Sequence, residues 1–171
     1  MKHIILALIV LVLAAALSAC GSGAEEPAEP DQPAAGEAPP ELTLYINEEE
    51  LLDLPPRTYE WNVDNGDGTW TGVCADAAHP LDARDDLPEV DTSAAWFTGT
   101  VDILLEEGME ITGVSWWDAE QAGYDDQQEV SGEVLVTDKT VYRLPVAAGR
   151  VYEIHVDFGD RGDSFYAFAA R

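Results

Sequence analysis

Hydrophobic and polar residues alternate with a period of two over much of the chain after residue 42. The clearest case is the segment 150–158, where Tyr152, Ile154 and Val156 share one face while Glu153 lies on the mostly polar opposite face. Successive side chains of a β-strand point to opposite sides of the sheet. The pattern therefore predicts a strand with one buried face and one largely solvated face.

The same alternation, interrupted by glycine, proline and aspartate, predicts eight further strands. They are expected at residues 42–46, 58–63, 69–75, 98–105, 110–117, 132–137, 140–144 and 164–169. Asn65-Gly66-Asp67-Gly68, between two of them, is a strong signal for a hairpin turn. Many short strands with this punctuation predict an all-β fold. We expect an immunoglobulin-like antiparallel β-sandwich, with a small β-barrel as the alternative.

The first 19 residues follow a different pattern. Lys2 precedes an unbroken apolar run at 4–17, which is shorter than the roughly 20 residues of a membrane-spanning helix and has the length of a signal-peptide core. The run ends in Leu17-Ser18-Ala19-Cys20, which resembles the lipobox of bacterial lipoproteins. The resemblance implies that residues 1–19 are a signal peptide and that Cys20 carries a diacylglyceryl (and acyl, such as palmitate) anchor.

This anchor implies a location on the extracytoplasmic face of the cell membrane. Two or three acyl chains on Cys20 would hold the protein far more firmly than one chain, which binds only marginally. Gly21 stands where an aspartate commonly marks inner-membrane retention in Gram-negative lipoproteins. An outer-membrane location is therefore an open alternative if the organism is Gram-negative, and the sequence does not reveal the type of envelope.

The rest of the chain divides at residue 41. Residues 20–41 contain the lipidated cysteine and a stretch of proline, alanine, glycine and glutamate, without aromatic or β-branched residues. Such a stretch cannot bury enough surface to fold, so it is expected to be a disordered tether. All 5 tryptophans, 6 tyrosines and 4 phenylalanines follow it, within residues 42–171. We expect that region to form a single β-sandwich domain.

The charge of the chain limits its partners. The 34 acidic residues all follow Cys20, and the whole chain has a formal net charge of -26. Binding to nucleic acid requires a basic face that neutralises phosphates, so nucleic-acid binding is not expected. Anionic lipid headgroups should repel the chain as well, which leaves the lipid anchor as its expected contact with the membrane.

Cys74 and His79 form a weak candidate metal site. Lipidation of Cys20 leaves Cys74 without a disulfide partner, and its place in an expected strand favours a buried structural cysteine. Together with Asp76, the pair could bind zinc, but a zinc site needs three or four ligands. We therefore favour a His79 imidazole that hydrogen-bonds the backbone and fixes a turn. The turn sequence 64–68 resembles a calcium loop only superficially.

Trp116 and Trp117 are candidate ligand-binding residues. Because they are adjacent on an expected strand, their side chains must face opposite sides of the sheet. One is expected in the core. The other is expected to be exposed, where an indole can stack on a sugar ring or a peptide, or to be covered by the loop 118–129.

Several short motifs, built mainly of aromatic and turn residues, occur between residues 55 and 170. They are Tyr59-Glu60-Trp61, Val73-Cys74-Ala75-Asp76, His79-Pro80-Leu81, Val114-Ser115-Trp116-Trp117, 149–154 and 162–168. Together they resemble a group of small uncharacterised lipoproteins from Firmicutes-type bacteria. The resemblance covers most of residues 55–170 and implies an extracytoplasmic sandwich without catalytic residues.

No nucleophile elbow, phosphate-binding loop or metalloprotease helix occurs in the sequence, so we do not expect an enzyme. The expected function is that of a membrane-anchored binding or interaction module, with an envelope protein, a glycan or a peptide as ligand. The alternative is a lipoprotein that binds calcium or zinc. No other cofactor is expected, and the sequence predicts no oligomeric state.

Overall fold

The computed structural model describes residues 38–47, 49–123, 129–132, 135–138 and 140–171, and for residues 50 and 135–138 it describes the backbone only. The expected signal peptide, Cys20 and nearly all of the expected tether lie outside this part of the chain. Within it, no helix is long and apolar enough to cross a membrane. All described residues belong to one compact unit.

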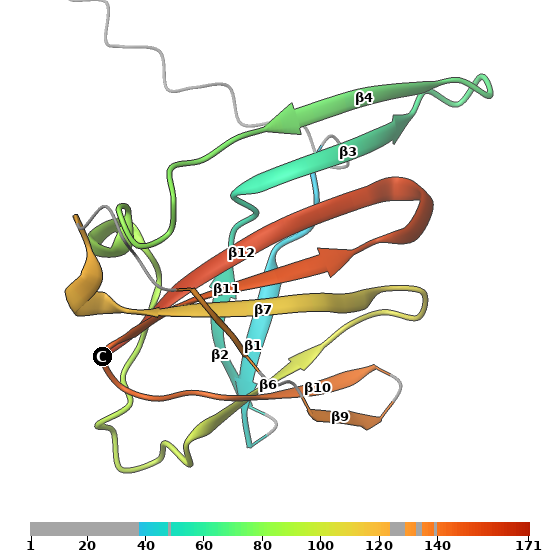
Figure 1. Ribbon diagram of the computed structural model, residues 1–171. Coiled ribbons are helices and arrows are strands. Elements are labelled where there is room, and N and C mark those ends of the chain that lie inside the picture. The colour runs from blue at the N-terminus through green and yellow to red at the C-terminus, as the bar shows by residue number, and fades with distance from the viewer. Residues whose placement is uncertain (1–37, 48, 124–128, 133–134, 139) are drawn as a thin grey trace, which may run out of the picture. The chain divides into compact units, whose positions relative to one another are not determined.

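The described chain consists of strands joined by turns and three short 3-10 helices (Figure 1). The strands are β1 (Leu42–Ile46), β2 (Glu49–Leu54), β3 (Thr58–Asp64), β4 (Trp70–Ala75), β5 (Glu89–Val90), β6 (Thr100–Leu104), β7 (Glu110–Asp118), β8 (Val130–Ser131), β9 (Leu135–Asp138), β10 (Val141–Pro145), β11 (Arg150–Asp157) and β12 (Gly162–Ala170). The 3-10 helices are η1 (Arg84–Asp86), η2 (Ala119–Gln121) and η3 (Gly159–Arg161).

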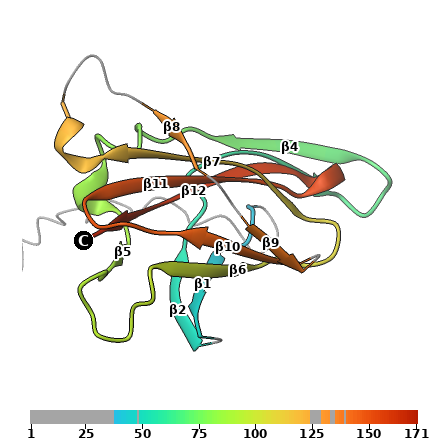
Figure 2. The same ribbon diagram turned by 60° about the horizontal axis from the view of Figure 1, so that its bottom comes forward.

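These strands form two sheets. The first sheet has the order β2-β1-β6-β10-β9, and the second has the order β4-β3-β12-β11-β7-β8, with β5 added in parallel to β12. The other pairings are antiparallel. The sheets lie on each other as two layers (Figure 2). The prediction of an all-β sandwich is confirmed, and the alternative of a closed barrel is not.

The main core lies between the two sheets. The alternation expected for 150–158 is present in β11, where Tyr152, Ile154 and Val156 are buried in this core. Tyr152 stacks on Phe168 of β12, with ring centroids 5.0 Å apart and ring planes 8° from parallel. The pairing of β11 with both β12 and β7 places this strand inside the second sheet, where its inward face is fully covered.

A second, smaller hydrophobic cluster covers the outer face of the second sheet. Apolar side chains of β7, β11 and β12 meet those of residues 79–88, a connecting segment that we call the cover segment. The cluster contains Leu81, Leu87, Trp117, Val151, Ala167 and Ala169. One end of the second sheet is therefore buried on both faces, which explains why the end of β12 is continuously apolar rather than alternating.

The structure differs from the predicted strands at β2, at β5 and at residues 132–137. Neither β2 nor the two-residue strand β5 was predicted. The acidic and leucine-rich sequence of β2 has no β-branched residue. Of the expected strand 132–137, residues 135–137 belong to β9, which pairs with β10 of the first sheet. The two residues before this expected strand form β8, which pairs with β7 of the second sheet. Gly132 follows β8 directly. A Cβ there would be 2.8 Å from the Cγ1 of Val114, so the chain passes the second sheet too closely for a larger residue.

Candidate functional site

A pocket opens where β1 and β6 diverge within the first sheet. These strands share only two registered residue pairs, Leu44 with Ile103 and Tyr45 with Asp102. On their other sides each is paired over five positions, β1 with β2 and β6 with β10. Both ribbon views show β1 running steeply across the direction of β6 (Figures 1 and 2). Because strands that separate leave the space between the sheets uncovered, the core becomes accessible at this point.

The pocket has a volume of about 460 Å³, which is within the usual range of small-molecule sites. Its inner wall comes from the second sheet, where Trp61 and Phe158 meet edge to face with ring centroids 5.3 Å apart. Its mouth includes Tyr45 and Leu104 of the first sheet, and Leu104 is 50% exposed. The pocket is thus open to solvent at its mouth, whereas Trp61 and Phe158 of the inner wall are 5% and 7% exposed.

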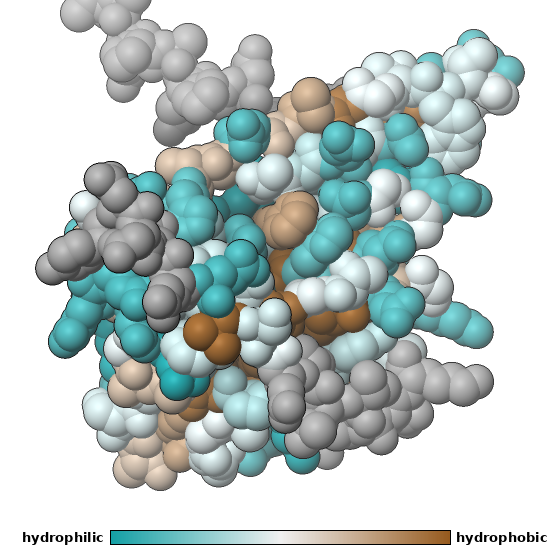
Figure 3. All heavy atoms as spheres, in the orientation of Figure 1, coloured by the Kyte–Doolittle hydropathy of each residue, from teal (hydrophilic) through white to brown (hydrophobic). Residues whose placement is uncertain are grey.

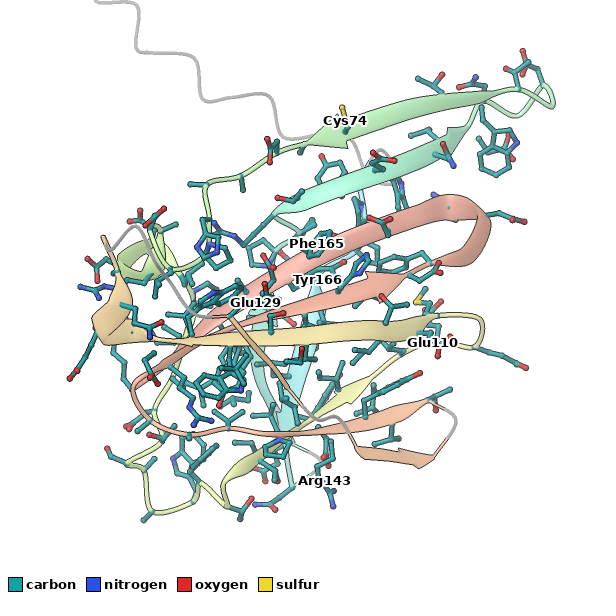
Figure 4. All side chains as sticks on the ribbon, in the orientation of Figure 1. Cys74, Glu110, Glu129, Arg143, Phe165 and Tyr166 are labelled. Carbon is teal, nitrogen blue, oxygen red and sulfur yellow. The ribbon has the colours of Figure 1, made fainter. Side chains whose placement is uncertain are left out.

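Tyr166 ties the beginning of the described chain to this wall. Its hydroxyl donates a hydrogen bond of 2.7 Å to the carbonyl oxygen of Pro40. Burial raises the pKa of the Tyr166 phenol well above its ordinary value, so the hydroxyl remains a donor at physiological pH. Figure 4 shows Phe165 and Tyr166 side by side on β12, and as neighbours on a strand they face opposite sides of the sheet.

Three charged side chains line the pocket: Arg161, Glu41 and Glu106. The Arg161 guanidinium lies 4.7 Å from the centroid of the Trp61 ring, and its Nε donates a hydrogen bond of 3.1 Å to the carbonyl oxygen of Asn62. The two glutamates are exposed. The lining therefore combines aromatic rings, one cation that already contacts a ring, and two carboxylates on the solvent side.

A second hollow, of about 530 Å³, lies beside Tyr45 on the first sheet. It is polar, and its two charged side chains are already paired. The Arg143 guanidinium donates two hydrogen bonds of 2.7 Å to the two carboxylate oxygens of Asp102. This hollow is a weaker candidate for ligand binding than the aromatic pocket, because its two charged side chains already bind each other.

The structure confirms that Trp116 and Trp117 face opposite sides of β7, but it does not leave either as an open ligand surface. Trp117 is 4% exposed and belongs to the cluster under the cover segment. Trp116 is half-buried against the main core, with the Arg150 guanidinium 3.5 Å from its ring centroid. The exposed indoles are instead those of Trp70 and Trp96, at 52% and 47% exposure.

His79 has the structural role that the sequence favoured. Its Nδ1 accepts a hydrogen bond of 3.3 Å from the backbone N–H of Leu81, and its ring packs edge to face on Trp117 with centroids 4.7 Å apart. In the part of the chain that the structure describes, no group of three or more histidine, cysteine or acidic side chains is arranged to hold a metal ion. The turn 64–68 uses its side chains internally, as in the 2.8 Å hydrogen bond from the Gly66 N–H to the Asp64 carboxylate.

The prediction that Cys74 is buried is wrong. Cys74 is a free, exposed cysteine on β4, opposite Glu60 of β3 (Figure 4). β4 is the last strand of the second sheet on this side, and most of its residues are exposed. The sequence correctly predicted a strand here but gave no sign that it lies at an edge of the sheet, where little packs against its faces.

We expect the Cys74 thiol to react with a maleimide or Ellman's reagent as completely in the folded protein as in urea, because it is exposed on an edge strand. The variant Cys74→Ser, which retains Cys20, gives the background of the assay. Labelling of Cys74 only after unfolding would contradict the exposed position.

A polar network spans β7, β11 and β12 on the outer face of the second sheet. The Thr112 hydroxyl lies 2.9 Å from His155 Nδ1, and His155 Nε2 lies 3.7 Å from a carboxylate oxygen of Asp163. The imidazole stacks on Phe165, with centroids 4.2 Å apart and planes 3° from parallel. Although the order of groups resembles a nucleophilic triad, Thr112 is also 3.4 Å from the His155 carbonyl oxygen, at a β-bulge. We interpret the network as cross-strand support of that bulge.

Glu153, on the same face, gives stability a pH dependence. Burial raises the pKa of its carboxyl; Arg57 opposes this effect and Glu129 adds to it. A carboxyl whose pKa is higher in the folded state is stabilising when protonated, and it becomes unfavourable as the pH rises from its unfolded value through its folded value. We expect Glu153→Gln to raise the melting temperature at pH 7 and to leave it nearly unchanged at pH 4.

Thermal unfolding followed by circular dichroism at both pH values measures this effect. Glu60→Gln is the matched control, since it removes one negative charge from an exposed position on β3 of the same sheet. An equal gain from both variants at pH 7 would show that the general charge of the chain, and not the burial of Glu153, is responsible.

Comparison of the chain with protein-family models, curated proteins and solved structures yields no match. The resemblance to small lipoproteins of Firmicutes-type bacteria stays a prediction.

The aromatic pocket was not expected from the sequence. Phe158 ends the alternating segment 150–158, and nothing in that pattern indicates that a pocket forms beside it. Arg161, which contacts Trp61, is separated from it by 100 positions in the sequence, so no local motif connects them. The one local hint of the pocket in the sequence is that Phe158 and Arg161, which both line it, are only three positions apart.

Proposed function

We propose that the protein is a lipoprotein, anchored to a membrane through Cys20, whose sandwich domain binds a ligand on the extracytoplasmic side. The observation that supports this proposal best is the aromatic pocket between β1 and β6. It is large enough for a small ligand or a side chain, it is open to solvent at its mouth, and it combines apolar with charged side chains. A binding role requires no catalytic residues, which agrees with the absence of catalytic motifs in the sequence.

The rest of the surface favours a specific pocket over broad apolar contact. Hydrophilic residues cover most of the face seen in Figure 3, and the chain has a net charge of -26. Such a surface keeps a protein soluble and apart from non-specific partners. A ligand site is then expected where apolar side chains remain accessible, as at Leu104.

The neutral fluorophore N-phenyl-1-naphthylamine tests the pocket. We expect it to bind the full chain saturably with one site per molecule and with increased emission. The variant Leu104→Glu places a charge at the pocket mouth and should weaken binding. Val130→Glu is the matched control, because Val130 is a similarly exposed apolar residue on a different strand, outside the pocket. No saturable binding, or equal loss in both variants, would contradict the proposal.

The anchor is tested separately with Cys20→Ser. Without the thiol no diacylglyceryl group can be attached, so we expect the variant to move from the membrane fraction to the soluble fraction, or to accumulate with residues 1–19 uncleaved. Metabolic labelling with a radioactive fatty acid should label the parent chain alone. Label incorporated equally into the variant would contradict lipidation at Cys20.

A further inference from the structure

We infer that the ligand of the aromatic pocket is an organic cation, with an ammonium or guanidinium head group. This inference rests on the proposed binding function and adds the chemical class of the ligand. It follows from the lining of the pocket, from a cation that the protein itself places on that lining, and from the charge around the mouth.

The wall of the pocket already binds a cation of the protein. The Arg161 guanidinium lies over the Trp61 ring at 4.7 Å, within the distance at which the negative face of an indole attracts a positive charge. The same arrangement occurs at Arg150 and Trp116, at 3.5 Å. At the pocket, Tyr45, Phe158 and Tyr166 extend the aromatic lining beyond Trp61. Of these rings, Tyr45 is partly exposed at the mouth, whereas Trp61, Phe158 and Tyr166 are buried behind it. A ligand cation would therefore meet Tyr45 first and the buried rings at the base of the pocket.

The ionic groups of the lining favour a positive ligand. Glu41 and Glu106 contribute two carboxylates, whereas Arg161 contributes one positive charge, which already contacts Trp61 and hydrogen-bonds the backbone at Asn62. The field of the whole chain acts in the same direction, because its net charge is -26. A cleft lined mainly by one sign of charge concentrates ligands of the opposite sign.

Inorganic cations fit this site less well than organic ones. Calcium and magnesium require several oxygen ligands at short distance, and the described residues contain no cluster of three acidic, histidine or cysteine side chains that could supply them. An aromatic wall instead suits a weakly hydrated cation with an apolar surface. The volume of about 460 Å³ accommodates such a head group together with part of an apolar body.

Three probes separate charge from shape. We would titrate the full chain in detergent, at low salt, with choline, with its neutral carbon isostere 3,3-dimethyl-1-butanol, and with N-acetylarginine methylamide. Binding is followed by NMR at the indole N–H of Trp61, assigned with Trp61→Phe. We expect choline or the arginine derivative to shift this resonance saturably, and the neutral isostere to bind at least about tenfold more weakly. The stronger of the two cations identifies a quaternary ammonium or a guanidinium ligand.

Variants connect the binding to the named residues. Glu41→Gln combined with Glu106→Gln should weaken the preferred cation about tenfold at low salt, and less at 0.15 M salt because the attraction is screened. Arg161→Gln removes a competing positive charge and should strengthen the binding of the preferred cation. Glu60→Gln is the control for the loss of a negative charge, because Glu60 is exposed and does not line the pocket. Spectra of each variant establish that it is folded.

The outcomes distinguish the two proposals. Equal affinity for choline and its isostere would overturn the cationic ligand and leave the apolar pocket as a binding site. The same conclusion follows if neither cation binds while the naphthylamine does. If the naphthylamine also fails to bind, the proposed binding function fails with the inference.

Discussion

Alanine at position 162 is expected to lower the free energy of unfolding by about 3 kcal/mol or more, through φ strain of about 1–2 kcal/mol and a similar steric term. Gly162 has a φ of +116°, which side chains rarely adopt. A Cβ there would lie 2.0 Å from the carbonyl oxygen of Glu60 and 3.3 Å from the Cα of Trp61. Both atoms belong to the backbone of β3, which is paired with β4 on its other side and cannot easily move.

The steric part of this effect can be separated by a second variant. Gly149 also has a positive φ, of +75°, but a Cβ there would meet nothing within 4 Å. Gly149→Ala should therefore lower the free energy of unfolding only by the φ strain, about 1–2 kcal/mol. Urea unfolding followed by tryptophan fluorescence compares the two. Equal destabilisation by Gly162→Ala and Gly149→Ala would mean that β12 and β3 are not in close contact at Gly162.

The position of Gly162 also matters for the pocket. It separates Arg161, whose guanidinium lies on Trp61, from Asp163, which faces the outer side of the second sheet near His155. The close approach of β12 to β3 at Gly162 thus fixes the start of β12 and the direction of Arg161. A side chain at position 162 that pushed β12 away from β3 would disturb the pocket wall along with the sheet. Gly162 variants are therefore unsuitable for testing ligand binding.

Local patterns in the sequence predicted the strands well where packing follows the alternation. The expected strand 42–46 coincides with β1, and the expected strand 150–158 agrees with β11 within one residue. Alternation did not predict β2. Its pairing with β1 gives this segment a strand conformation that its composition does not favour. β-strand formation depends strongly on such context.

The candidate site was harder to predict, because alternation identifies two faces of a strand but not what covers them. Cys74 was expected to be buried, and it is exposed on an edge strand. Trp117 was one of two candidate ligand-binding tryptophans, of which one was expected in the core, and it is buried beneath the cover segment. The pocket depends on the divergence of β1 and β6, which is a property of the assembled sheet. Each of these facts is decided by long-range pairing that no short segment encodes.

Removal of the Trp117 side chain is expected to destabilise the protein by about 3–5 kcal/mol, as for other buried tryptophans replaced by alanine. The indole fills the second cluster, between the sheet and the cover segment, and its ring contacts the His79 ring. Val151 of β11 belongs to the same buried cluster. Without it, Leu81 and Leu87 would face a cavity. This loss is a large part of the 5–15 kcal/mol that stabilises typical domains.

The loss should be accompanied by local opening of the cover segment. The backbone N–H groups of Asp82 and Ala83 donate to the His79 carbonyl oxygen, and that of Leu81 donates to the His79 ring. We expect faster hydrogen exchange at these three amides in Trp117→Ala, beyond what the global loss of stability produces. Exchange measured by NMR at matched global stability, reached with urea in the parent protein, isolates the local effect.

Trp70→Ala is the control for the loss of an indole, because Trp70 is 52% exposed on the edge strand β4. It should change the free energy of unfolding by about 0.5 kcal/mol or less. If Trp117→Ala were equally mild and left the three amides protected, the cover segment would not depend on Trp117. Trp117 would then be an accessible residue on the outer face of the second sheet and would compete with the pocket between β1 and β6 as a candidate binding site.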